Sequence, residues 1–219
     1  MYSENKKTAR IAGIWWVLFI IAGAVSYMVI DSKLLAPDDT AAILDNIGAN
    51  TALFLAGAAM FFAGYAFFIM LGKALYKLFK PFGSGLAKIM MGFLIAGTAL
   101  VAAGKVAEIA AAVSGNIETT AFLFELRANI EMAGELFWGL WLVPLILLML
   151  KSGFAPKIVG AAAVLAVVYH IAVFTAFFAG GFDVSGNPAL SVLGLVGELA
   201  VVLWLLIFPP TRKKGEAKL

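Results

Sequence analysis

Six long apolar segments are the feature of this sequence that most restricts its fold. Each is close to the roughly 20 residues that a helix needs to cross the hydrocarbon core of a bilayer. Hydrophobic residues make up 63% of the chain and charged residues only 13%, whereas about a quarter of a typical soluble domain is charged. We therefore predict an all-α polytopic membrane protein, with a single six-helix transmembrane domain over residues 1–219. The expected helices are about 10–30, 52–79, 86–113, 121–150, 158–179 and 190–208.

The basic residues predict how these helices are oriented, because lysine and arginine concentrate in the cytoplasmic loops of membrane proteins. Here they gather at alternate ends of the segments: Lys6, Lys7, Arg10, Lys73, Lys77, Lys80, Lys88, Lys151, Lys157, Arg212, Lys213 and Lys214. Apart from Lys33, the opposite ends hold acidic residues: Asp31, Asp38, Asp39, Asp45, Glu118 and Asp183. We expect both termini in the cytoplasm. The apolar run of the first segment continues to Ile30, so we expect an uncleaved helix there.

The longest outer connection, between the first two helices, is expected to contain a short amphipathic helix. Pro37 and Asp38 are typical of a helix start. Ile43, Leu44 and Ile47 would then share one face. We expect this helix to lie on the outer surface as a cap on the bundle, and a gate over the outer end is the alternative.

Several function classes are excluded by what the sequence lacks. It contains no cysteine, which rules out disulfides, thiolate nucleophiles and cysteine-ligated metal centres. It has no glycine-rich phosphate loop and no nucleophile elbow, so no catalytic motif is recognised. The net charge of +3 reflects membrane topology, and no basic surface for nucleic acid is expected. The sequence thus favours a non-enzymatic role and requires no cofactor.

Seven ionisable groups lie inside the predicted helices, and they form the candidate site. Charges inside a bilayer cost at least about 2.5–3.5 kcal/mol each, so they face inward and pair. With a rise of about 1.5 Å per residue, the positions of these groups bring them to one layer in the outer half of the bundle. They are Lys105, Glu108, Arg127, Glu131, Glu135, His170 and Glu198.

The charges of this set do not balance. Lys105 and Arg127 supply two positive charges against four glutamates, which leaves two negative charges if His170 is neutral. Burial does not tolerate this excess. Either some carboxylates hold protons, or His170 is cationic, or a bound cation supplies the balance.

We therefore predict that these residues bind or pass a proton, a cation or a small polar ligand. One alternative is a divalent metal held by Glu131, Glu135, His170 and Glu198 in a metal-dependent membrane enzyme. Another is a module that binds an amphiphile, such as a lipid or a quinone, with its head group in the polar layer. The simplest alternative is a structural network whose ion pairs lock the helices together.

Three stretches of the sequence resemble one known family. They are KKTARIAGIWWVLFIIAG near the start, GELFWGLWLVPLILLMLKSGFAPKIVG in the centre and VGELAVVLWLLI near the end. In this order, over roughly residues 5–208, they resemble the bacterial membrane proteins grouped as domain of unknown function 4386. The resemblance implies a six-helix, multi-pass protein of the bacterial cytoplasmic membrane, surrounded by membrane lipids. It implies no activity for any residue.

Overall fold

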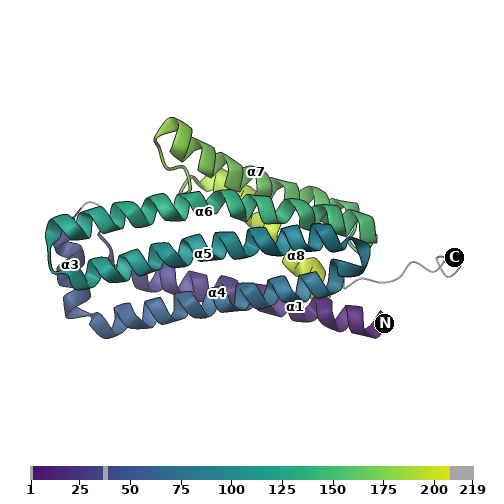
Figure 1. The fold of residues 1–219 in the computed structure, drawn as a ribbon, viewed down its shortest axis with the longest axis horizontal. Coiled ribbons are helices and arrows are strands. Elements are labelled where there is room, and N and C mark those ends of the chain that lie inside the picture. The colour runs from purple at the N-terminus through teal and green to yellow at the C-terminus, as the bar shows by residue number, and fades with distance from the viewer. Residues whose placement is uncertain (1, 37–38, 208–219) are drawn as a thin grey trace, which may run out of the picture.

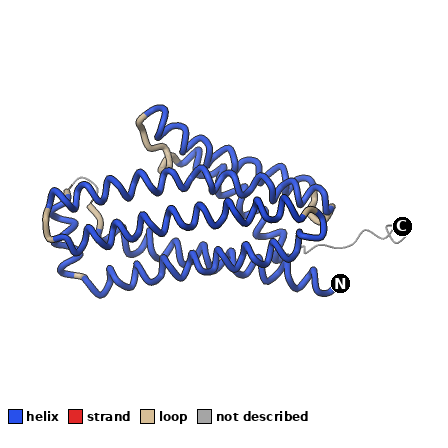
Figure 2. The backbone as a smooth tube through the Cα atoms, in the orientation of Figure 1, coloured by secondary structure: helices blue, strands red, loops and turns tan. Residues whose placement is uncertain are grey.

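The computed structural model describes residues 2–36 and 39–207, which form helices joined by short connections (Figure 2). Within these residues there is no strand. The helices in chain order are α1 (Tyr2–Gly23), the π-helix η1 (Ala24–Asp31), α2 (Ser32–Leu34), α3 (Thr40–Ala49), α4 (Thr51–Phe79), the 3-10 helix η2 (Lys80–Phe82), α5 (Ser84–Ser114), α6 (Ile117–Ser152), α7 (Lys157–Gly180) and α8 (Pro188–Ile207).

Six helical spans in the described residues are long and apolar enough to cross a membrane, which confirms the predicted fold class. The first span is longer than expected, because η1 and α2 continue α1 as far as Leu34. α6 is also longer, since it begins at Ile117 and has 36 residues. At about 1.5 Å per residue it is roughly 54 Å long, well beyond the 30 Å or so of a hydrocarbon core.

The six spans form a closed ring in chain order. α1 packs on α4, α4 on α5, α5 on α6, α6 on α7, and α7 on α8, which returns to contact α1. The most extensive of these contacts joins α5 and α6. The ring encloses an interior that side chains from every span can reach.

The start of α6 is set by the sequence around Gly115. Gly115 ends α5 at a φ of 63°, a left-handed conformation that glycine adopts without strain. The next residue, Asn116, caps α6 by accepting a hydrogen bond from the backbone nitrogen of Thr119 at 2.9 Å. Gly153 ends the same helix at a φ of 64°. Both ends of α6, the helix that carries three of the seven candidate residues, are thus fixed locally.

One cluster of buried apolar residues contains members of all six spans. Trp16 of α1 lies against Trp141 of α6, with ring centroids 5.4 Å apart. α7 contributes small side chains such as Ala163, and α8 contributes Val201 and the large side chain of Trp204. This core fixes the rotation of each helix about its axis, and therefore fixes which polar side chains point inward.

A smaller apolar cluster lies under α3, at the end of the bundle opposite the N-terminus (Figure 1). α3 lies in the connection where a helix was expected, and Asp39 caps it by accepting from the backbone nitrogen of Ala42 at 2.9 Å. Ile43 and Ile47 are buried and Leu44 is half-buried. The expected start at residues 37–38 lies outside the described residues. The location of this helix on the outer membrane surface stays a prediction.

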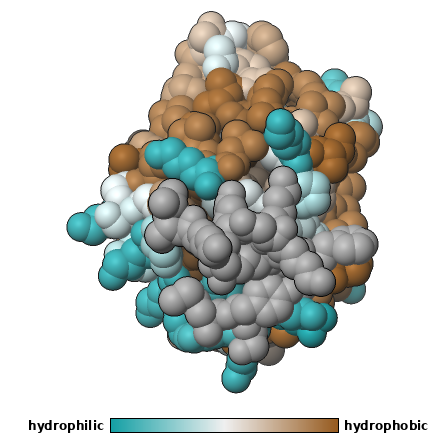
Figure 3. Space-filling model, turned by 90° about the vertical axis from the view of Figure 1, so that its right-hand side faces the viewer, coloured by the Kyte–Doolittle hydropathy of each residue, from teal (hydrophilic) through white to brown (hydrophobic). Residues whose placement is uncertain are grey.

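The basic residues expected to face the cytoplasm do gather at one end of the bundle. The N-terminus, the α4–α5 connection and the α6–α7 connection share this end (Figure 1). Figure 3 views it directly and shows hydrophilic side chains beside a hydrophobic flank. Arg212, Lys213 and Lys214 lie outside the described residues. Which side of the membrane this end faces stays a prediction.

Gly197 of α8 determines how closely α8 approaches α7. A β-carbon at this position would lie 2.6 Å from the backbone nitrogen of Ala166 and 2.8 Å from the backbone oxygen of Ala162. We expect Gly197→Ala to force the helices apart and to lower the free energy of unfolding by about 1–3 kcal/mol. Unfolding in detergent measures this. The control is Gly92→Ala, where a β-carbon meets no atom within 4 Å. Equal stability of the two variants would show that Gly197 does not set the distance between α7 and α8.

Candidate functional site

One face of α6 carries the charges that organise the site. Arg127, Glu131, Glu135 and Trp138 follow one another at intervals of four, four and three residues, so they form a stripe along the helix. Near the start of the stripe Arg127 contacts α5, and further along Glu135 contacts α7. α6 therefore links two separate polar clusters.

The first cluster, which we call the Lys105 network, is a chain of alternating charges. Lys105 Nζ donates hydrogen bonds to Glu108 Oε1 at 2.8 Å and to Asp31 Oδ2 at 3.1 Å. Arg127 Nε lies 3.0 Å from Glu108 Oε2 and 3.0 Å from Glu131 Oε1. The Lys105 side chain is 0% exposed and that of Glu108 1%. Each cation bridges two carboxylates, and Glu108 joins the two cations.

Neighbouring residues on η1, α4 and α5 shape the surroundings of this network. A β-carbon at Gly104 would lie 3.1 Å from Glu131 Cγ, so the glycine gives α6 the room to bring Glu131 close. The Lys105 ammonium lies 4.9 Å from the ring centroid of Phe61 and 5.6 Å from that of Tyr27. Aromatic faces attract cations, so these rings stabilise the buried charge together with the carboxylates.

Asp31 reaches the network because the first span changes from an α-helix to a π-helix at Ala24. Nine residues separate Asp31 from buried Ala22, about two and a half turns of an α-helix, which would place Asp31 on the opposite face. A π-helix has i→i+5 hydrogen bonds and about 4.4 residues per turn, so nine residues make about two turns. Asp31 therefore returns to the buried face, where it is 6% exposed.

The second cluster, which we call the His170 triad, joins α6, α7 and α8. His170 Nδ1 lies 2.6 Å from Glu135 Oε2, and His170 Nε2 lies 3.2 Å from Glu198 Oε1. The imidazole is 5% exposed, whereas the side chains of Glu135 and Glu198 are 17% and 27% exposed. Both ring nitrogens of this buried histidine thus have a carboxylate partner.

These two contacts restrict the protonation states in which both of them can be hydrogen bonds. An ionised carboxylate only accepts hydrogen bonds, and a neutral imidazole has one N–H. Either an imidazolium donates to both glutamates, or a neutral imidazole donates to one glutamate and accepts from the protonated other. In both arrangements two carboxylates share one added proton with the ring, so the net charge of the triad is −1.

The Lys105 network has the same net charge. Its three carboxylates, Asp31, Glu108 and Glu131, exceed its two cations by one. Together with the triad, the two clusters therefore hold five carboxylates against three basic side chains. This confirms that the interior contains a buried polar cluster.

All seven candidate residues lie in these two clusters, but the single site expected from the sequence is divided. The network contains Lys105, Glu108, Arg127 and Glu131, and the triad contains Glu135, His170 and Glu198. Asp31 is the member that the sequence analysis missed, since it counted Asp31 only among the acidic residues of the outer ends. The available signal was its position directly after an uninterrupted apolar run.

The four residues considered as metal ligands are divided in the same way. Glu131 contacts Arg127, whereas Glu135 and Glu198 contact the two nitrogens of His170. In the part of the chain that the structure describes, no three His, Asp or Glu side chains are arranged to hold a metal ion. The metal hypothesis therefore gains no support from the geometry.

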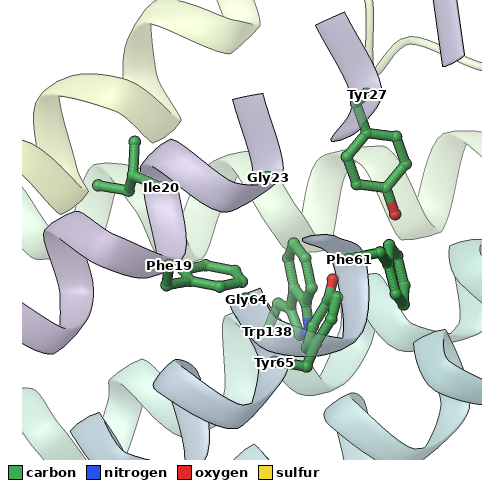
Figure 4. A pocket seen from close by; sticks show the side chains of 8 residues that line it. All are labelled: Phe19, Ile20, Gly23, Tyr27, Phe61, Gly64, Tyr65 and Trp138. Carbon is green, nitrogen blue, oxygen red and sulfur yellow. The ribbon is translucent and has the colours of Figure 1, made fainter. Parts of the chain in front are cut away.

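Two neighbouring cavities lie beside the clusters. The larger, with a volume of about 170 Å³, is the aromatic cavity shown in Figure 4. The smaller has a volume of about 40 Å³, and Glu198 of the triad lies in its wall. Phe19 and Trp138 line both cavities and separate them. The aromatic cavity is lined by Phe19, Ile20, Gly23, Tyr27, Phe61, Gly64, Tyr65 and Trp138.

Comparison with known proteins identifies a family. Residues 11–208 match the family described as Domain of unknown function (DUF4386). No curated protein and no solved structure matches the chain. The family match covers most of the 219 residues and includes nearly all of the three stretches that suggested the resemblance. The chain therefore belongs to the DUF4386 family.

Proposed function

We propose that this multi-pass protein of the bacterial cytoplasmic membrane binds a proton at the His170 triad and passes it along α6. The observation that carries the proposal is the position of the His170 imidazole between two carboxylates, inside a helical bundle. Carboxylates and histidines at membrane depth are the usual components of proton relays. The triad has this composition and holds one proton in either of its two hydrogen-bonded arrangements.

The short contact between His170 and Glu135 supports transfer as well as binding. The two arrangements of the triad differ only in which atom carries the proton. Exchange across the Nδ1–Oε2 contact of 2.6 Å needs no movement of a helix. The partial exposure of Glu198, 27% of its side chain, gives the opposite end of the triad contact with the adjacent cavity. A proton can therefore enter at one glutamate and leave at the other.

Glu131 is the next proton acceptor in this proposal. It lies one helical turn before Glu135 on the same face of α6, and its side chain is 18% exposed. Glu108 is unsuited to this role, because it bridges both Lys105 and Arg127. Among the described ion pairs Glu131 contacts Arg127 alone, so protonating it disturbs the network less.

The proton count of the triad is directly measurable, because His170 is the only histidine in the chain. Nitrogen-15 labelling of histidine gives NMR signals from one imidazole, and infrared difference spectra report protonated glutamates. At neutral pH we expect either an imidazolium, or a neutral imidazole accompanied by one protonated glutamate that disappears in Glu135→Gln or Glu198→Gln. A neutral imidazole between two ionised glutamates would contradict the proposed proton site.

Passage of the proton is tested in liposomes that contain the purified protein and a pH-sensitive dye. We expect the wild-type protein to dissipate an imposed pH gradient, and Glu135→Gln and His170→Phe to lose at least about nine-tenths of that rate. The matched control is Glu125→Gln, an exposed glutamate on the same helix, which should retain the wild-type rate. Equal rates for the wild type and the triad variants would show that the triad does not carry protons, and would favour its structural alternative.

A further inference from the structure

The walls of the aromatic cavity form a nearly complete aromatic box. Phe61 lies between Tyr27 and Tyr65, with ring centroids 5.8 and 4.7 Å away. Tyr65 in turn lies 6.0 Å from Trp138 and 5.5 Å from Phe19. Figure 4 shows the hydroxyl groups of Tyr27 and Tyr65 directed toward each other from opposite sides of the space. Five aromatic side chains thus surround one small volume.

The size of this space restricts its occupant. At about 170 Å³ it is close to the engineered cavities of about 150 Å³ that hold one benzene molecule. A lipid chain or a quinone with its tail would not fit into this volume as a whole. A compact ligand of a few non-hydrogen atoms fits.

The charge around the cavity selects among compact ligands. The two clusters beside it hold five carboxylates against three basic side chains, an excess of acidic groups. Glu198 lies in the wall of the adjoining smaller cavity, behind Phe19 and Trp138. Two of the box residues, Tyr27 and Phe61, already contact the ammonium of Lys105. Lys105 does not oppose a second cation strongly, because Asp31 and Glu108 are both ion-paired with it.

We propose that the aromatic cavity binds a small organic cation, a methylated ammonium of the size of tetramethylammonium or choline. Aromatic boxes recognise such ions because several ring faces meet the dispersed positive charge at once, and the attraction increases when water is excluded. The charge excess of the surrounding layer offsets the unfavourable transfer of the cation from water. The proposal rests on the cavity and its charges and does not depend on passage of a proton.

Two ligands of the same shape test whether binding depends on the positive charge of the ligand. Choline and 3,3-dimethylbutan-1-ol differ in that a carbon replaces the charged nitrogen. Calorimetric titration of the purified full-length protein in detergent should show choline and tetramethylammonium binding, with the neutral alcohol at least about tenfold weaker. Equal affinity for choline and the alcohol would overturn the proposal and leave a simple apolar cavity, and no binding of either cation at about 10 mM would also overturn it.

The location is tested by filling the cavity at Gly23. This residue lines the space, and a β-carbon there meets no atom within 4 Å. We expect Gly23→Leu to abolish choline binding and Gly23→Ala to weaken it. The matched control is Gly92→Leu, another glycine of a membrane-spanning helix with open space at its β-carbon, which should bind choline as the wild type does. Unchanged binding in both Gly23 variants would place the cation elsewhere and overturn the proposal.

These measurements separate the cation site from the proton site. Failure of choline binding leaves the nitrogen-15 signals of His170 and the proton flux unaffected. Conversely, if the triad lacks its added proton, the comparison of choline with the neutral alcohol and the Gly23 variants still test the cation site. Gly23→Ala also guards against a folding defect, because alanine favours a helix more than glycine does.

Discussion

Replacing Lys105 with methionine is expected to lower the free energy of unfolding by about 3–5 kcal/mol, the range measured when one partner of a buried ion pair is removed. Methionine preserves most of the length and the apolar stem of lysine, so the change is mainly electrostatic. Asp31 and Glu108 would then lie buried, 6% and 0% exposed, without the ammonium that contacts both. Unfolding by a denaturing detergent, followed by tryptophan fluorescence, measures the difference.

The matched control is Lys88→Met on the same helix, because Lys88 is exposed near the other end of α5. This variant should remain within about 0.5 kcal/mol of the wild type. A second comparison also removes the two carboxylates that Lys105→Met leaves without a partner. We expect the triple variant Lys105→Met, Asp31→Asn, Glu108→Gln to recover much of the lost stability, because neutral replacement of a whole buried ion pair is often tolerated. If Lys105→Met proved as stable as Lys88→Met, the network would not be a buried ion-pair network.

The fold was predictable because it follows from local properties of the chain. The length and apolarity of the segments predict six spans, and each is found within the described residues. The interval of four residues between Arg127, Glu131 and Glu135 predicts their shared face of α6. The predicted start of α6, at about residue 121, was four residues too late. Ile117 and Glu118 follow a capping asparagine, which is a weaker signal in the sequence than the apolar run.

The division of the site into two clusters was not predictable from helical spacing. The rise per residue gives the depth of a side chain, but its direction depends on how the helix is rotated against its neighbours. Packing around Trp16 and Trp141 decides that rotation, and no local pattern reports it. Thus Glu131 and Glu135, one turn apart, contact different partners: Arg127 in one case and His170 in the other.

The inward direction of Asp31 is a second feature that the sequence could not predict. Its inward direction depends on the change to a π-helix after Gly23, and a sequence read with the period of an α-helix places it on the opposite face. The same segment supplies Tyr27 to the wall of the aromatic cavity, and Gly23, which directly precedes the segment, also lines that cavity. π-Helical segments often occur at functional sites. One departure from α-helical geometry therefore contributes to both the ion-pair network and the proposed cation site.

Replacing His170 with leucine is expected to lower the free energy of unfolding by about 2–4 kcal/mol near neutral pH, because Glu135 and Glu198 lose the group that bridges them. The expected value is below that for Lys105→Met, since these two carboxylates retain some exposure. Without the imidazole the two carboxylates face each other, and a proton bound between them relieves their repulsion. The loss should therefore be smaller at about pH 5 than at about pH 7.5.

Adding Glu198→Gln to His170→Leu removes the repulsion without restoring the imidazole. We expect the double variant to recover at least about half of the lost stability at neutral pH, and to lose the pH dependence that His170→Leu introduces. Glu125→Gln in the same His170→Leu background is the control, because Glu125 is exposed and lies on the same helix as Glu135. A loss of stability that is equal at both pH values, with no recovery from Glu198→Gln, would assign His170 a packing role. Recovery specific to Glu198→Gln would instead show that the folded protein depends on the charge held between these two glutamates, which a proton-binding triad requires.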